Sequence, residues 1–165
     1  MRILRETTQC AIALGSNLGD SLGILTAALQ VLAATPGIRV QAVSSWYQTK
    51  PVGGIPQPDY LNGCALLQVL IQPHQLLKIL LATETKFGRV RRERWGARTI
   101  DLDLLLYDDL ILDTPELQIP HPRLNERAFV LIPLAEIAPQ WIEPVSGNAI
   151  AQLVQAVDCS GVRKI

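Results

Sequence analysis

The stretch TIDLDLLLY at residues 99–107 decides the fold, because its residues alternate with the period of a β-strand. Its apolar residues are expected on one face of that strand: Ile100, Leu102, Leu104 and Leu106. Asp101 and Asp103 then project together from the other face. The wholly apolar face predicts a central, half-buried strand, on which two unpaired carboxylates would be costly. The two aspartates therefore need positively charged partners or a cation.

The segments before this strand are expected to alternate between strands and helices. They are a strand at 9–14, a helix at 20–34, strands at 38–47 and 60–71, and a helix at 73–87. Pro73 suits the first turn of its helix, because the backbone N–H at that position has no partner within the helix. The resulting order is β-α-β-β-α-β, which predicts an α+β fold with a ferredoxin-like core, an antiparallel sheet and helices on its faces.

The residues after position 107 are predicted to form a C-terminal extension of this core. The extension begins with a proline-rich crossing at 115–122 and continues with a helix at 124–137 and a final amphipathic helix at 148–157. A loop rich in proline and glycine is expected at 49–58, but no segment has the composition of a linker between domains. We therefore expect a single domain over residues 1–165.

The composition argues against several functional classes. The chain has 165 residues, 48% hydrophobic and 18% charged, which is typical of a globular domain. Its formal net charge is zero, whereas proteins that bind nucleic acid or membranes usually carry a basic excess. The three cysteines form no metal-binding pattern, and neither a signal peptide nor a membrane-spanning run is evident. We expect a cytoplasmic monomer that binds small molecules, and neither nucleic acid nor a membrane.

Residues 86–98 place a dense positive charge directly before the two aspartates. Six basic residues are opposed only by Glu93: Lys86, Arg89, Arg91, Arg92, Arg94 and Arg98. Arginine makes bidentate contacts with phosphate oxygens, and Trp95 in the same segment offers a flat face to a heterocycle. Magnesium takes one or two carboxylates together with phosphate oxygens. A magnesium-chelated polyanion such as ATP therefore explains the arginines and the Asp101–Asp103 pair together.

These residues alone leave other interpretations open. The aspartates could pair with the neighbouring arginines, and the basic segment could be a solvated loop or a nucleic-acid patch. The turn at 15–19 lacks the following Lys-Ser/Thr of a Walker A motif. One competing function is another magnesium-dependent nucleotidyl or phosphoryl transferase. The other is a non-catalytic nucleotide-binding or RNA-binding module with a ferredoxin-like fold.

Four motifs within residues 11–139 resemble one known family, in that family's order. They are ALGSNLG at 13–19, PDYLN at 58–62, RWGARTIDLD at 94–103, and PHPR at 120–123 with RAFV at 127–130. In these motifs the chain is similar to the 6-hydroxymethyl-7,8-dihydropterin pyrophosphokinase family of folate synthesis. Ala97 stands where that family usually has proline, and alanine contributes no side-chain chemistry there.

The resemblance implies a reaction and a set of site residues. The hydroxymethyl oxygen of the pterin would attack the β-phosphorus of ATP, and AMP would be released. Two magnesium ions at Asp101 and Asp103 would bridge the ATP oxygens and activate the hydroxyl, with Asp103 a candidate base. Arg89 and Arg98 would contact the phosphates as their charge shifts. The implied ATP contacts are Glu84, Arg89, Arg91, Arg98, His121 and Arg127. The implied pterin contacts are Thr49, Pro51, Val52, Tyr60, Asn62, Trp95 and Phe129.

The chemistry of several of these residues agrees with the implied roles. Tyr60 and Asn62 alternate onto one strand face, and an amide such as that of Asn62 suits the amino-pyrimidinone edge of a pterin. Aromatic rings such as those of Tyr60 and Phe129 are otherwise typical of core packing. Glu84 lies toward the apolar stripe of its helix, where a salt bridge with an arginine is the alternative to nucleotide binding.

Overall fold

In the interior of the main sheet lies β1 (Thr8–Ser16), in a computed structural model that describes residues 7–51, 56–88 and 99–165. β1 pairs with β4 (Tyr60–Val69) on one side and with β5 (Asp101–Tyr107) on the other. β2 (Ile38–Val43) pairs with the far edge of β4. These pairings are all antiparallel. The order β5-β1-β4-β2 confirms the ferredoxin-like core.

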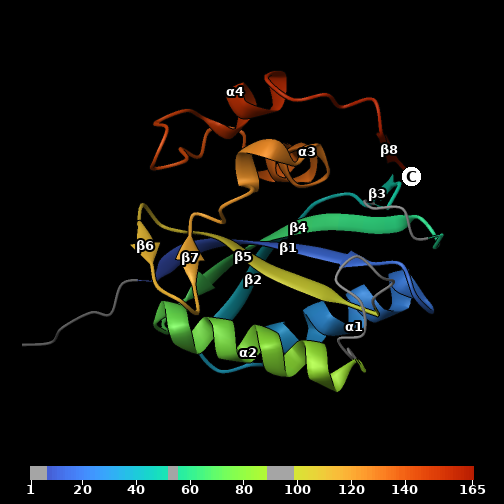
Figure 1. The fold of residues 1–165 in the computed structure, drawn as a ribbon. Helices are drawn as coiled ribbons and strands as arrows, with labels where there is room; N and C mark the ends of the chain where they lie inside the picture. Colours follow the sequence, from blue (N-terminus) through green and yellow to red (C-terminus); the bar gives the residue numbers. More distant parts are fainter. Residues whose placement is uncertain (1–6, 52–55, 89–98) are drawn as a thin grey trace, which may run out of the picture.

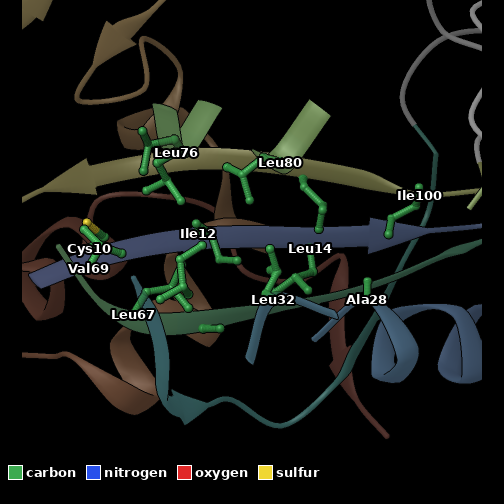
Figure 2. Packing of buried hydrophobic residues seen from close by; sticks show 14 of the residues in the cluster. Cys10, Ile12, Leu14, Ala28, Leu32, Leu67, Val69, Leu76, Leu80 and Ile100 are labelled. Atoms are coloured by element: carbon green, nitrogen blue, oxygen red, sulfur yellow. The ribbon is translucent and has the colours of Figure 1, made fainter. Parts of the chain in front are cut away.

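Two helices cover one face of this sheet, below it in Figure 1. They are α1 (Ser21–Ala33) and α2 (Pro73–Lys86), as the periodicity predicts. The Asp20 carboxylate caps α1 by accepting the Gly23 N–H at 3.2 Å. Leucines of both helices pack against the apolar face of β1 and β4, and Figure 2 shows the resulting cluster. Its fully buried members include Ile12, Leu14, Leu32, Leu67, Leu76, Leu80 and Ile100.

The other face of the sheet is covered by α3 (Ala128–Ile137), with α4 (Ile150–Gln155) beyond it in Figure 1. A second apolar cluster joins this face to α3, including Ala11, Cys64, Leu66, Leu105, Leu106, Val130 and Leu134. The single helix predicted over 124–137 is divided, because Arg127 has an extended backbone between the 3₁₀ turn η1 (Leu124–Glu126) and α3. No described helix is long and apolar enough to cross a membrane.

The strand predicted over 38–47 is also divided. β2 ends at Val43, and a separate strand, β3 (Tyr47–Thr49), pairs farther along the same edge of β4. The break follows from packing at Gly63 of β4, where a Cβ would lie 2.7 Å from the Trp46 ring. The outer edge of β3 pairs with β8 (Val162–Lys164), a strand that the sequence did not predict.

β5 differs from its predicted position and pattern. Among the described strands it pairs only with β1, so it lies at the edge of the main sheet and is not central. A register shift opposite Ala11 and Ile12 interrupts its alternation, so Leu105 and Leu106 both join the α3-side cluster. A two-stranded sheet of β6 (Leu112–Asp113) and β7 (Gln118–Ile119) follows β5 in the chain. Asp101 and Asp103 precede the shift and therefore keep their common face.

Candidate active site

A cleft of about 990 Å³ lies where β5, β4 and β3 meet the segment before α3, and residues of α2, among them Glu84, also line it. It brings together these predicted residues: Thr49, Tyr60, Asn62, Glu84, Asp101, Asp103, His121, Arg127 and Phe129. Pro51 is half-buried and is not among the residues that line the cleft. The remaining predicted residues lie outside the described parts of the chain: Val52, Arg89, Arg91, Trp95 and Arg98.

The two aspartates form one side of this cleft. Asp101 lies opposite Gly15 of β1, and Asp103 lies opposite Ala13. Both are half-buried, and both face the cleft. Residues two apart on a strand are roughly 7 Å apart along the backbone. Their carboxylates can therefore act on one ligand group.

Gly15 forms the floor of the cleft between Asp101 and Asn62. On its other side it pairs with Asn62 of β4, so Asp101, Gly15 and Asn62 make one row across the sheet. A Cβ at Gly15 would lie only 2.8 Å from the Asn62 Oδ1. Only glycine leaves this floor open, although the sequence pattern suggested merely a turn there. A glycine at the end of a strand is the signal that could have indicated it.

Asn62 and Thr49 form a buried polar pair on the far side of Gly15. The Asn62 side-chain amide donates to the Thr49 hydroxyl at 2.7 Å, and the two residues are 7% and 6% exposed. Tyr60 lies on the same face of β4 as Asn62 and pairs directly with Thr49 of β3. This part of the cleft therefore combines an oriented amide, a hydroxyl and an aromatic ring.

His121 is a neutral hydrogen-bond donor on the aspartate side. Burial and the charge of Arg127 lower the pKa of His121 to about 4, with a smaller effect from Arg123, although Asp101 acts in the opposite direction. Its Nδ1 accepts the backbone N–H of Arg123 at 3.1 Å, so the ring proton is on Nε2. The His121 backbone N–H donates to the Leu105 carbonyl at 3.0 Å and fixes the ring beside β5.

Arg127 and Phe129 lie at the start of α3 and join the two sides of the cleft. The Arg127 guanidinium carbon is 5.5 Å from the centre of the Phe129 ring, within the range of a cation–π contact. Burial lowers the pKa of Arg127, whereas Asp103 and Asp101 act to raise it. An arginine remains charged even so. Positive charge is therefore present opposite the two carboxylates.

Comparisons with known proteins identify the family of this chain. A model of the family 7,8-dihydro-6-hydroxymethylpterin-pyrophosphokinase (HPPK) matches residues 11–139. The chain belongs to the HPPK family. A 2-amino-4-hydroxy-6-hydroxymethyldihydropteridine pyrophosphokinase of Synechocystis sp. is 52% identical over 151 residues, which is 92% of this chain and 77% of the relative. The enzyme of that name from Methylorubrum extorquens is 42% identical over 158 residues, which cover 96% and 99% of the two chains.

A solved structure also shares the HPPK fold. A crystal structure of a Plasmodium falciparum HPPK-DHPS variant superposes with a TM-score of 0.73 over 92% of this chain, at 13% identity. The present chain covers 46% of that longer chain. This likeness concerns the fold alone.

Glu84 of this HPPK has a contact that the sequence did not indicate. It is 3% exposed, and its Oε2 accepts the backbone N–H of Leu102 at 2.8 Å. Leu102 lies between the two aspartates, so the carboxylate fixes the part of β5 that carries them. Hydrogen bonds to charged groups are among the stronger ones in proteins. Glu84 therefore positions the aspartate strand in addition to lining the cleft.

Asn17 is a site-supporting residue that sequence reasoning missed. It is 4% exposed, and its side-chain amide donates to the Gln57 Oε1 at 2.8 Å and to the Pro58 carbonyl at 2.9 Å. These bonds attach the start of β4 to the end of β1. An asparagine inside a turn cluster was the available signal, but its partner lies 41 residues away and cannot be read from local pattern.

Proposed function

We propose that this cleft is where the chain carries out the reaction of its family, with ATP on the aspartate side and the pterin on the Asn62 side. The chain is an HPPK, which transfers a pyrophosphoryl group to hydroxymethyldihydropterin in folate biosynthesis. The observation that supports the placement is the row of Asp101, Gly15 and Asn62 across one sheet face. This row directs a carboxylate and an amide into one cleft, with no side chain between them.

The pterin side has the groups that a flat, polar bicycle requires. Asn62 and Thr49 are buried and hydrogen-bonded to each other, so their polar atoms are held in one orientation before the ligand arrives. They can bind the amino-pyrimidinone edge, while Phe129 and Tyr60 contact the ring faces. Gly15 then allows the hydroxymethyl group to extend toward the aspartates. We infer the same pterin role for Pro51, Val52 and Trp95.

The phosphate side combines a neutral donor with a fixed positive charge. The Nε2–H of His121 is directed to a phosphate oxygen in this proposal, and Arg127 balances the polyphosphate charge. We infer that Arg89, Arg91 and Arg98 are further ATP contacts on this side, and Glu84 holds β5 through the Leu102 N–H. Phosphoryl-type transfer requires in-line positioning and charge neutralisation more than covalent catalysis.

Asp101 and Asp103 fit magnesium. HPPK family members are generally magnesium-dependent, and these residues offer hard carboxylate oxygens from one strand face. Among the described residues no group of three or more acidic, histidine or cysteine ligands is present. Two carboxylates, completed by phosphate oxygens and water, match the preference of magnesium. Magnesium bound there would neutralise phosphate charge and lower the pKa of the substrate hydroxyl. We assign two ions to this pair, with Asp103 placed to accept the hydroxyl proton.

AMP release from ATP, with and without 6-hydroxymethyl-7,8-dihydropterin, tests the proposal. We expect AMP only when both substrates and magnesium are present. We also expect residues 1–165 to act as one domain in this assay. D103N should lower kcat by about 100-fold or more, and N62A should raise the pterin KM by about ten-fold with little change in the ATP KM. D113N is the matched control, because Asp113 bonds Gln118 in the separate β6–β7 sheet. Equal effects of N62A on both KM values would contradict the two-sided cleft.

A further inference from the structure

β3 is a very short strand that holds one wall of the cleft. It has three residues, Tyr47 to Thr49, and its last residue is the partner of Asn62. Its pairing with β4 begins immediately after the break at residues 44–46. A three-residue strand has few backbone bonds of its own. The position of Thr49 therefore depends on what else fastens β3.

Besides its pairing with β4 and β8, β3 is fastened by Glu136, near the C-terminal end of α3. One carboxylate oxygen, Oε1, accepts the hydroxyl of Tyr47 on β3. The other, Oε2, accepts the Ser45 backbone N–H at 2.8 Å and the Ser45 hydroxyl at 3.1 Å. Three donors from one short segment thus converge on a single carboxylate. The Tyr47 side chain is 7% exposed, so the packing around it holds its ring in place.

The same helix carries the opposite wall of the cleft. Phe129 and Glu136 are seven residues apart in α3, which is close to two helical turns, so both project from one side of the helix. Phe129 lines the cleft at one end of α3, and Glu136 is bonded to β3 at the other. The distance between the Phe129 ring and Thr49 is therefore set by how α3 and β3 are joined.

We propose that Glu136 is a positioning residue for pterin binding, because it joins α3 to β3 and so fixes the gap between Phe129 and Thr49. This inference rests on the proposed pterin side of the cleft. Glu136 does not line the cleft, so it acts through β3 and not by touching the ligand.

The protonation states of Tyr47 and Glu136 favour the hydrogen bond between α3 and β3 at neutral pH. Burial, and then the hydrogen bond to Glu136, raise the pKa of Tyr47 to about 12, so the phenol keeps its proton and donates it. Burial acts to raise the pKa of Glu136, but the bonds from Tyr47 and Ser45, with Lys164 nearby, lower it overall. Lys164 lies directly opposite Tyr47 across the β3–β8 pairing. The carboxylate is therefore charged at neutral pH and faces three donors and one cation.

Four variants test the inference. E136A removes every acceptor, and Y47F removes one donor. E136Q is the conservative variant, because its amide oxygen can accept from Ser45 while its amide N–H donates to the Tyr47 oxygen. Y107F is the matched control, since the Tyr107 hydroxyl donates to the Ile71 carbonyl at 2.7 Å and Tyr107 does not line the cleft.

Steady-state AMP release gives the pterin KM at saturating ATP and the ATP KM at saturating 6-hydroxymethyl-7,8-dihydropterin, and thermal unfolding is followed in parallel. Y47F is expected to raise the pterin KM about five-fold, the ratio expected for one lost hydrogen bond. E136A removes all three bonds and is expected to raise the pterin KM at least as much. In both variants kcat and the ATP KM should stay within about two-fold of the parent. E136Q should restore the parental pterin KM. Y107F should lower the melting temperature without changing either KM.

Three results would overturn the inference in distinguishable ways. If N62A raises the pterin KM but E136A and Y47F do not, the pterin side is correct and Glu136 has no positioning role. If N62A also leaves the pterin KM unchanged, the placement of the pterin fails and the inference fails with it. If E136A raises both KM values and E136Q does not reverse the rise, Glu136 supports the fold as a whole and has no specific role in pterin binding.

Discussion

The most direct test of the cleft floor is the substitution Gly15→Ala. The added Cβ would lie 2.8 Å from the Asn62 Oδ1, whereas ordinary contacts begin at 3.4 Å, so the amide must move by about 0.6 Å. Asn62 cannot yield freely, because it is 7% exposed and donates to Thr49 at 2.7 Å. Overpacking of this kind costs about 1–3 kcal/mol of stability. A misplacement near 1 Å in an active site can cost about 100-fold in rate.

We therefore expect G15A to lower kcat/KM for the pterin by about ten-fold to 100-fold, while the ATP KM changes little. The assay is AMP release under pterin titration at saturating ATP, with the melting temperature measured in parallel. Gly147→Ala is the control, because Gly147 does not line the cleft and a Cβ there meets nothing within 4 Å. Its φ of 75° disfavours alanine, so this variant should lower the melting temperature without changing the pterin KM. A G15A protein with the parental pterin KM would refute the reasoning that Gly15 separates the two sides of the cleft.

Three further outcomes are expected. E84A should lower the free energy of unfolding by about 1–3 kcal/mol, because it leaves the buried Leu102 N–H without this acceptor. E84Q should restore most of that loss. Chemical denaturation measures both variants. The pKa of His121 is lowered to about 4 in the folded chain. Between pH of about 6.5 and 4, His121 therefore binds a proton in the unfolded chain but stays neutral in the folded chain, so the free energy of unfolding should fall as the pH drops through this range. H121Q should flatten that slope in melting curves recorded across this range. N17A should lower the midpoint of urea unfolding by removing the bonds to Gln57 and Pro58, and an unchanged midpoint would contradict the anchoring role.

Sequence periodicity predicted the elements with long apolar patterns. The helices after Asp20 and from Pro73, and the strands β1 and β4, follow from local spacing alone. The common face of Asp101 and Asp103 was likewise predictable, since it depends only on alternation within one strand. The edge position of β5 was not, because a run of leucines looks the same wherever its strand lies in a sheet.

The elements that the sequence missed depend on contacts between distant residues. The division between β2 and β3 requires the Trp46 ring to occupy the space above Gly63, and β8 exists only because β3 offers it an edge. Leu105 and Leu106 share a cluster because of a register shift that no alternation reveals. Tertiary context decides such short elements, and local propensity does not.

The candidate site shows the same limit. Tyr60 and Asn62 could be assigned to one face, but their alignment with Gly15 and Asp101 needed the register of three strands. The pattern around Glu84 suggested a bond to an arginine or a nucleotide, and it gave no sign of the bond to the backbone of β5 that the structure adds. Glu136 carried no pattern at all, because its importance lies in which two elements it joins.

The edge position of β5 has a consequence for how copies of this protein behave at high concentration. An uncovered strand edge invites a strand of another molecule to pair with it. Here the outward Leu102 N–H is taken by Glu84, and the outward Leu105 carbonyl by the backbone of His121. A second molecule would have to displace both before it could extend the sheet. The Glu84 and His121 bonds to β5 thus also hinder aggregation of the enzyme through this strand edge.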